Sequence, residues 1–207
     1  MNKPTIGIIG AGGHCKVVID IINEMGTYTI IGVYDDHKEG DVSGVKIIGK
    51  VCDIHQAMNV DEFIIAIGND HVRKTIYETY PYLIWATVIH PRAIISKSAK
   101  IAIGCVVCAG AVVQPDVMIG KHCIINTNCN IDHEAMIGNY CSVCPGVTIC
   151  GQVKIGDETF VGANATIIQN LTVGHHCVIG AGTVIIRNVE HEVKIVGNPG
   201  KLISSLK

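Results

Sequence analysis

The chain has 207 residues and a formal net charge of −2, and only 16% of its residues are charged and 4% aromatic. This composition offers neither a basic surface nor a set of stacking platforms, which argues against a nucleic-acid-binding protein. No apolar run approaches the roughly 18 residues of a membrane span, and the chain enters its first predicted strand without a signal-peptide pattern. We therefore expect a cytoplasmic protein, away from membranes, whose partners are small molecules.

The first 88 residues predict a small α/β domain of Rossmann-like type. Apolar β-branched runs indicate strands, and longer apolar runs with helical spacing indicate helices. Strands are expected over residues 5–9, 29–34, 63–67 and 83–88, and helices over residues 17–25 and up to about residue 80. The domain has no second βαβ half, so it suits one nucleotide better than two.

A glycine-rich turn, Gly10 to Lys16, separates the first strand from the first helix. Glycine permits close backbone approach, and a helix N-terminus presents free N–H groups to a phosphate. The second strand ends at Asp35 and Asp36, where a carboxylate could reach ribose hydroxyls. The NAD fingerprint is imperfect, because its third glycine falls at Cys15. His14 is either a turn residue at the helix start or a ligand contact.

From residue 89 onward the chain follows a six-residue repeat. Every sixth residue from Ile89 to Ile185 is Ile or Val, and nearly all residues four places further on are small or β-branched. This period matches neither a helix nor a simple strand, and it predicts a hexapeptide parallel β-helix in which 18 residues form one triangular coil. We expect the β-helix over residues 89–190 and a C-terminal cap over residues 191–207, with a helical tail that covers the open edge.

The ten cysteines include two pairs with zinc-like spacing, Cys105 with Cys108 and Cys141 with Cys144. However, Cys105, Cys123 and Cys141 lie 18 residues apart, at the small inward position of successive coils. A buried free cysteine behaves as a small hydrophobic residue. The repeat therefore favours a structural role for these thiols, and we expect no metal site.

Asp132-His133-Glu134 is the densest titratable cluster of the repeat. An imidazole beside a carboxylate suits removal of a proton from an attacking amine or hydroxyl. In the alternative interpretation, His133 is one exposed polar residue among several. Small residues on the preceding face, such as Thr127, Ala163 and Ala181, would leave a trough for a long thin cofactor.

Several motifs along the whole chain together resemble one family. In order, they are Gly10-Ala-Gly-Gly-His14, Tyr34-Asp-Asp36, Ala66-Ile-Gly-Asn69, Arg73-Lys74-x-Ile-Tyr77, Ile89-His-Pro-x-Ala93, and Asp132-His-Glu134 within the hexapeptide run. They resemble the sugar acetyltransferases that include the sialic acid O-acetyltransferases and the bacterial N-acetyltransferases of nucleotide-linked 4-amino-4,6-dideoxy sugars.

The resemblance implies a left-handed parallel β-helix, a homotrimer with active sites between subunits, and acetyl-CoA as donor without a metal. Handedness does not follow from the residues, since strand crossovers normally turn right-handed. By the same resemblance, His133 matches the general base, Glu134 matches the acidic residue that increases its basicity, and Asn126 matches an active-site asparagine.

The resemblance also places the two substrates. It implies that the nucleotide part of the acceptor is held by Gly12, Gly13, His14, Asp35, Asp36 and Gly68. Ala163 and Ala181 match cofactor-contacting positions for acetyl-CoA. Ser142 stands where some members have a histidine near the thioester, so a backbone N–H would replace that contact.

The sequence thus favours an acetyl-CoA-dependent N-acetyltransferase acting on the 4-amino group of a UDP- or dTDP-linked 4-amino-4,6-dideoxy sugar. One alternative is an O-acetyltransferase of sialic acid or another sugar hydroxyl. The other is a nucleotide-binding oxidoreductase or sensor in which the β-helix serves only as an assembly module, which would require NAD.

Overall fold

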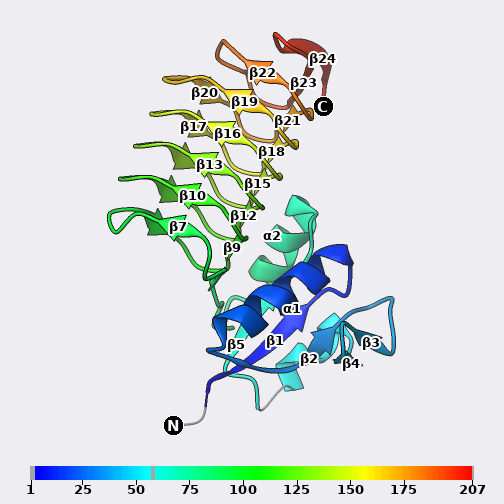
Figure 1. The fold of residues 1–207 in the computed structure, drawn as a ribbon. Helices are drawn as coiled ribbons and strands as arrows, with labels where there is room; N and C mark the ends of the chain where they lie inside the picture. The colour runs from blue at the N-terminus through cyan, green and yellow to red at the C-terminus, as the bar shows by residue number, and fades with distance from the viewer. Residues whose placement is uncertain (1–2, 57–58, 207) are drawn as a thin grey trace.

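The computed structural model of the protein describes residues 3–56 and 59–206. Figure 1 shows an α/β unit formed by the N-terminal third of the chain and, beside it, a stack of coils that ends at the C-terminus. Helix α2 lies between the two parts, next to the coils that carry β9 and β12. This arrangement matches the predicted fold class of a Rossmann-like domain followed by a β-helix.

The N-terminal sheet has five strands in the order β3-β4-β2-β1-β5, and only the pair β3–β4 is antiparallel. Its elements are β1 (Thr5–Ile9), α1 (Gly13–Met25), β2 (Thr29–Tyr34), β3 (Asp41–Val42), β4 (Val45–Gly49), the 3-10 helix η1 (Val51–Gln56), β5 (Glu62–Ile65) and α2 (Asp70–Thr79). The predicted strands over residues 5–9 and 29–34 are confirmed at both ends. Both predicted helices are present, and α1 begins four residues earlier than expected, at Gly13.

Alternating side chains of the central strands pack on opposite faces of this sheet. Ile6 and Ile8 face α1, whereas Ile9 and Ile65 face α2 and Trp85. Two separate apolar clusters result, and both are buried because parallel strands are covered on each side. The α1 cluster includes Val106 and Cys108 from the second coil of the β-helix. The two halves of the chain therefore share core residues.

The sequence did not predict the β3–β4 hairpin or helix η1, and it wrongly predicted a strand over residues 83–88. Ser43 and Gly44 connect β3 to β4 with positive φ values of 50° and 80°, the conformation that two-residue hairpin turns require. Residues 83–87 form only an isolated bridge, between Trp85 and Phe63, and the next strand, β6, begins at Val88.

The β-helix consists of three sheets, which the chain visits in turn; apart from β23 and β24 at the C-terminus, their strands have two residues each and pair in parallel. The first sheet contains β6 (Val88–Ile89), β9 (Val106–Val107), β12 (Ile124–Ile125), β15 (Ser142–Val143), β18 (Phe160–Val161), β21 (Val178–Ile179), β23 (Val193–Val196) and β24 (Lys201–Ser205). The second contains β7 (Ile94–Ile95), β10 (Val112–Val113), β13 (Asn130–Ile131), β16 (Thr148–Ile149), β19 (Thr166–Ile167) and β22 (Val184–Ile185). The third contains β8 (Lys100–Ile101), β11 (Met118–Ile119), β14 (Met136–Ile137), β17 (Lys154–Ile155) and β20 (Thr172–Val173).

Each coil turns three corners, which we number by the sheet that the chain has just left. Corner 1 follows the first sheet and includes Asn126, corner 2 follows the second sheet and includes His133, and corner 3 follows the third sheet and includes Tyr140. A residue with positive φ stands at most corners, such as Asn128, Glu134 and Tyr140. Successive corners stack 18 residues apart, as the register of the strands requires.

The interior of the prism is filled by the repeated Ile and Val residues. From Val107 to Ile185 these side chains are buried, whereas Ile89, Ile95 and Ile101 in the first coil are only partly covered. The small residues of the second register are also inside. The thiols of Cys105, Cys123 and Cys141 hydrogen bond to the carbonyl oxygens of Gly120, Gly138 and Gly156, at 3.0, 2.9 and 3.2 Å. All ten cysteines are free.

The C-terminal tail is a strand and not the predicted helix. Strand β23 pairs with β21 in parallel, and β24 returns antiparallel to β23. Because the last coil offers unpaired backbone groups, a strand satisfies more of them than a helix would. The pairing overrides the weak helical pattern of the tail.

An aromatic cluster packs α2 against the third corner of the β-helix. The His122 side chain is completely buried, and its ring centroid lies 4.6 Å from that of Tyr77, 5.1 Å from that of Trp85 and 5.9 Å from that of Tyr140. Neither ring nitrogen of His122 has a hydrogen-bond partner among the described residues. Burial, reinforced by the charges of Arg73 and Lys121, lowers the pKa of His122 to about 4.

This burial predicts that the protein loses stability in mild acid. The pKa values of His122 and His14 are both lowered from 6.5 to about 4, so between these values the unfolded chain binds protons that the folded chain does not. Stability therefore falls as pH decreases through this window, by about 1.4 kcal/mol per pH unit for each histidine. The dependence of the unfolding free energy on pH can be measured by urea unfolding between about pH 6.5 and 5. In His122→Phe its slope should be roughly half that of wild type, because only His14 then contributes. An unchanged slope in a folded variant would contradict a neutral, buried His122.

Candidate active site

The glycine-rich turn opens a hollow where β1 and β5 end. Helix α1 begins at Gly13, and its N-cap residue Gly12 makes no side-chain capping bond. A Cβ atom added at Gly12, Gly13 or Gly68 would meet nothing within 4 Å. The start of α1 is therefore not covered by other side chains at these glycines, and a helix N-terminus of this kind suits a phosphate.

His14 lies at this helix start with its ring mostly buried. Its Nε2 atom is buried and has no partner among the described residues. Desolvation, together with the nearby Arg73 charge, lowers the pKa of His14 to about 4. The ring is therefore neutral near pH 7, and its unsatisfied nitrogen is suited to a hydrogen bond with a ligand.

Asp35 braces the glycine-rich turn. Its carboxylate accepts hydrogen bonds from the backbone N–H groups of Ala11 at 2.6 Å, and of His37 and Lys38 at 2.9 Å each. Partial desolvation opposes ionisation, but these three bonds outweigh it and hold the pKa of Asp35 below its ordinary value. Asp36 also binds a backbone group, the N–H of Val51 at 2.9 Å. Both carboxylates thus fix the loop around the hollow.

A cavity of about 590 Å³ adjoins these two aspartates. Lys38 and Lys50 line it, and the Lys38 ammonium donates to the carbonyl of Ala11 at 2.9 Å. We did not single out either lysine from the sequence. The only available signal was their proximity in sequence to Asp35, Asp36 and the end of β4.

His133 projects from corner 2 with 54% of its side chain exposed. Its Nδ1 atom lies 3.1 Å from Glu134 Oε2, and its backbone N–H donates to Asp132 Oδ1 at 2.8 Å. Gly151 lies directly beside the imidazole, because a Cβ there would come within 2.7 Å of the ring. With Nδ1–H donated to Glu134, Nε2 carries the lone pair and is available as a base.

Glu134 is held by two partners at the same corner. Gln152 Nε2, one coil further on, donates to Glu134 Oε2 at 3.0 Å. The hydrogen bonds from Gln152 and then His133 lower the pKa of Glu134, although the group is exposed. An ionised Glu134 keeps the imidazole oriented and stabilises the cation that forms when Nε2 takes a proton. A hollow of about 370 Å³ borders His133, Gly151 and Gln152.

Asn126, Ala163 and Ala181 share corner 1. Asn126 Oδ1 accepts from the backbone N–H of Thr127 at 2.8 Å, which fixes the amide plane. Ala163 and Ala181 stand on successive coils, where the N–H of Gly182 donates to the Ala163 carbonyl at 2.8 Å. This corner therefore carries only small side chains between its asparagines, which leaves its backbone accessible.

Ser142 is separate from this group. It stands at the start of β15 on the first sheet, is only 6% exposed, and its Oγ accepts a hydrogen bond from Arg73 Nη2 at 3.0 Å. The hydroxyl is therefore engaged in the contact between α2 and the β-helix. The structure does not bring Ser142 together with Ala163 or Ala181.

Within one chain, the predicted catalytic residues are also apart. Asn126 follows a strand of the first sheet and His133 follows a strand of the second, so one face of the prism separates the two corners. The hollow of about 370 Å³ that borders His133 is not lined by Asn126.

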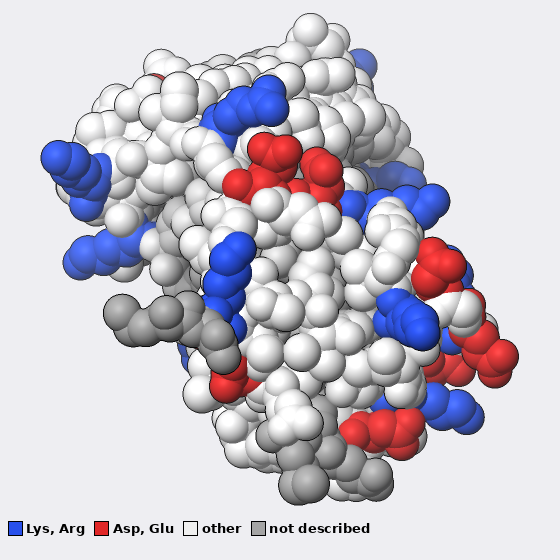
Figure 2. Space-filling view, turned by 60° about the horizontal axis from the view of Figure 1, so that its bottom comes forward, with Lys and Arg blue, Asp and Glu red and all other residues white. Residues whose placement is uncertain are grey.

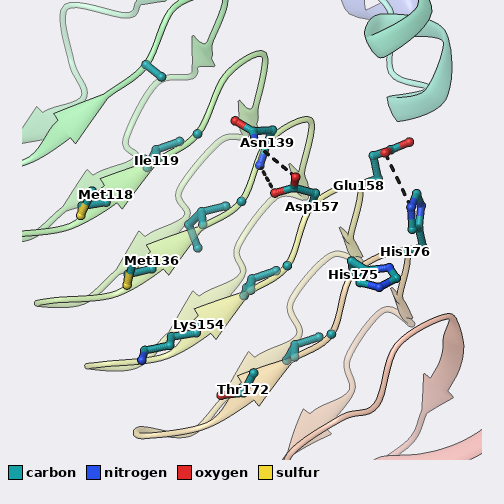
Figure 3. Close-up of a pocket in the computed structure, with 18 of the residues that line it drawn as sticks. Met118, Ile119, Met136, Asn139, Lys154, Asp157, Glu158, Thr172, His175 and His176 are labelled. Atoms are coloured by element: carbon teal, nitrogen blue, oxygen red, sulfur yellow. Dashed lines mark hydrogen bonds and ion pairs between the residues drawn. The ribbon is translucent and has the colours of Figure 1, made fainter.

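A groove of about 910 Å³ runs along the third sheet. Figure 3 shows Met118, Met136, Lys154 and Thr172 on successive strands of its floor, with Glu158, His175 and His176 at corner 3. None of the predicted catalytic, acceptor-binding or cofactor-binding residues lines this groove. A smaller hollow of about 260 Å³ lies on the second sheet, and none of Thr127, Ala163 and Ala181 lines it.

Surface charge is dispersed on the face drawn in Figure 2, where lysine and arginine side chains alternate with acidic ones and form no continuous basic area. Residues 3–56 and 59–206 contain no group of three His, Cys, Asp or Glu side chains arranged to hold a metal ion. No helix in this part of the chain is long and apolar enough to cross a membrane.

Two family profiles match the sequence. The family described as the PglD N-terminal domain matches residues 5–80, and the bacterial transferase hexapeptide family, a model of six repeats, matches residues 152–187. The UDP-N-acetylbacillosamine N-acetyltransferase of Bacillus subtilis is 35% identical over 110 residues, which are 50% of this chain and 51% of that protein. The chain spans between 20% and 51% of the length of the curated relatives it matches.

Solved structures match over nearly the whole chain. The acetyltransferase domain of PglB from Neisseria gonorrhoeae, in complex with acetyl coenzyme A, is 33% identical with a TM-score of 0.94, covering 98% of this chain and 100% of that one. PerB from Caulobacter crescentus, in complex with CoA and GDP-perosamine, is 30% identical with a TM-score of 0.92, covering 97% of each. The chain therefore belongs to the nucleotide-amino-sugar N-acetyltransferases that combine a PglD-type N-terminal domain with a hexapeptide-repeat β-helix.

Proposed function

We propose that the protein transfers an acetyl group from acetyl-CoA to the 4-amino group of a UDP- or dTDP-linked 4-amino-4,6-dideoxy sugar. The observation that carries this proposal is the exposed His133 imidazole, whose Nδ1 lies against Glu134 and whose Nε2 has no hydrogen-bond partner among the described residues. Relatives solved with acetyl coenzyme A, and with CoA and GDP-perosamine, support the two substrate classes. The name of the Bacillus subtilis relative supports an N-acetylated product.

The acceptor is assigned to the N-terminal domain, residues 1–88. The free N–H groups after Gly12 would hold the diphosphate, and the space above Gly13 and Gly68 leaves room for it. His14 would donate or accept a single hydrogen bond through Nε2. Asp35 and Asp36 keep this loop in place, and Asp36 is the more exposed of the two for a ribose contact.

The donor is assigned to residues 89–190, with residues 191–207 as a cap. Acetyl-CoA supplies an acyl group activated as a thioester, and the small side chains of Ala163 and Ala181 would let its pantetheine arm approach the backbone of corner 1. Asn126, on the same corner, would orient the acceptor amine. Ser142 would act only indirectly, through its contact with Arg73.

The chemical step needs one base and no metal. The acceptor nitrogen attacks the thioester carbonyl, a C–N bond forms, and His133 Nε2 takes the proton that the nitrogen loses. The C–S bond then breaks, and the proton held by His133 passes to the leaving CoA thiolate. Glu134 stabilises the intermediate imidazolium. Alignment of two bound substrates would supply much of the acceleration, and base catalysis about 10²–10⁴-fold.

The site is completed by a second copy of the chain. Asn126 and His133 lie on different corners, with a full face of the prism between them. A cyclic homotrimer would place corner 2 of one subunit beside corner 1 of the next. We therefore propose three equivalent active sites, one at each subunit interface, in a cytoplasmic enzyme.

A mass-spectrometric assay tests the reaction. Purified protein is incubated with acetyl-CoA and a panel of UDP-, dTDP- and GDP-linked 4-amino-4,6-dideoxy sugars, with the corresponding 4-hydroxy sugars and free sialic acid as controls. The proposal expects a gain of one acetyl group on an amino sugar and none on the controls. Acetylation of a hydroxyl control and of no amino sugar would mean that the protein is an O-acetyltransferase. Binding of NAD without any acetyl transfer would overturn the proposal.

A further inference from the structure

Helix α2 carries the motif Arg73-Lys74-x-Ile-Tyr77, to which the proposed reaction assigns no role. Arg73 is the largest side chain of the described residues that is fully buried, with 1% of its surface exposed. No carboxylate in the described part of the chain forms an ion pair with it. A guanidinium buried in this way must be stabilised by other polar groups, so its contacts are informative.

Those contacts lie on both halves of the molecule. Toward the N-terminal domain, Nη1 donates to the carbonyl oxygen of Gly68 at 2.8 Å and of Ile67 at 3.1 Å. Toward the β-helix, Nε donates to the carbonyl of His122 at 3.0 Å, and Nη2 donates to the carbonyl of Tyr140 at 2.6 Å and to Ser142 Oγ at 3.0 Å. One rigid planar group thus joins the two halves.

The N-terminal contact lies at the acceptor hollow. Gly68 follows β5, and a Cβ atom added there would meet nothing within 4 Å, as at Gly12 and Gly13. Because Arg73 holds the Gly68 carbonyl, it determines where this wall of the hollow stands. Lysine could not replace it, since a single ammonium lacks the planar fork of donors.

The contact with the β-helix leads to Asn126. Ser142 pairs with Ile124 in the adjacent strand, and the N–H of Asn126 donates to the carbonyl of Val143 at 2.9 Å. A short chain of hydrogen bonds therefore runs from Gly68 through Arg73 and β15 to Asn126. Ser142 and Val143 are both buried, so this path is packed along its length.

A second tether between α2 and the β-helix lies further out. Lys74 Nζ donates to Glu158 Oε1 at 2.7 Å, with a third of the lysine side chain exposed. This pair contacts neither Gly68 nor Ser142. It contributes to the attachment of α2 without touching the acceptor hollow, and it provides a matched control.

We propose that Arg73 is a positioning residue that fixes the acceptor pocket relative to Asn126, so that the bound amine meets the acetyl donor in a reactive geometry. This inference rests on the proposed function. Its physical basis is that each substrate can bind to its own half of the chain, whereas reaction requires the two halves in register. A displacement of about 1 Å can cost 10²-fold in rate.

The test compares Arg73→Lys with Lys74→Gln. For Arg73→Lys we expect kcat to fall by about 10²-fold. Its dissociation constants for CoA and for the nucleoside diphosphate of the accepted sugar, each measured alone by calorimetry, should stay within about twofold of wild type. Lys74→Gln should lower the thermal midpoint and leave kcat within about twofold. A purely structural Arg73 would instead resemble Lys74.

Hydrogen–deuterium exchange supplies a readout that does not depend on the reaction. Arg73→Lys should exchange faster than wild type in peptides that cover residues 66–70 and 140–144, and Lys74→Gln should not. If Arg73→Lys does not fold, Ser142→Ala replaces it, because that change removes one contact on the β-helix side; it should raise the exchange of the same peptides and lower kcat several-fold.

A folded Arg73→Lys variant, or a folded Ser142→Ala variant in its place, that has near-normal kcat and unchanged exchange would overturn the proposal. Absence of acetyl transfer by the wild-type protein would instead overturn the proposed function, while exchange still decides whether Arg73 holds the two halves in register.

Discussion

Replacing His133 with alanine is expected to lower kcat by about 10²–10⁴-fold, the range for loss of a general base. The imidazole is more than half exposed and lies over Gly151, so its removal should leave the β-helix intact. We expect normal circular dichroism and an unchanged dissociation constant for CoA. Initial rates of thiol release, measured with saturating acetyl-CoA and acceptor, give the result.

His176→Ala is the matched control. His176 also stands at a corner of the prism beside a carboxylate, with Nε2 3.7 Å from Glu158 and 45% of its side chain exposed, close to the 54% of His133. It lies at corner 3, away from the proposed site, so kcat should remain near that of wild type. If the His133 variant is folded and as active as the control, a different group must remove the proton.

Much of the β-helix could be predicted because its interior repeats one geometric requirement. Each two-residue strand buries a single inward side chain, so Ile or Val recurs every sixth residue from Ile89 to Ile185, and no other fold gives that period. The β3–β4 hairpin escaped prediction because its apolar residues do not alternate cleanly with burial; Ile48, for example, is 44% exposed. The tail after Gly200 forms a strand only because β23 offers a free edge, a tertiary cause that the local pattern does not contain.

The same distinction applies to the site. His133 and Glu134 are consecutive in sequence and share a corner, so their contact followed from the motif. The contacts of Arg73 with the β-helix join residues that are 49 to 69 positions apart, and they depend on how α2 docks against the β-helix. The position of Ser142 in the repeat was clear from the sequence, but the guanidinium of Arg73 that contacts it was not. Likewise, the sequence did not indicate that the Asp35 carboxylate accepts hydrogen bonds from three backbone N–H groups.

The separation of Asn126 from His133 predicts that two inactive variants restore each other. Asn126→Ala should lower kcat by about 10²-fold, because the amide orients the acceptor amine. In mixed oligomers assembled from equal amounts of Asn126→Ala and His133→Ala chains, some interfaces combine an intact Asn126 from one subunit with an intact His133 from the next. For random assembly into a cyclic oligomer this holds for about a quarter of the sites.

Co-expression of the two variants with different affinity tags, followed by purification through both tags, provides the mixed oligomers. Their activity should exceed the summed activity of the two separate variants by more than tenfold and approach a quarter to a third of wild type, as expected for random cyclic assembly. Co-expression of His133→Ala with the double variant Asn126→Ala/His133→Ala is the control, since no intact imidazole is then present. If the mixed oligomers are well formed but their activity is not restored, each chain completes its own site, and Asn126 and His133 of different chains do not act on the same substrate.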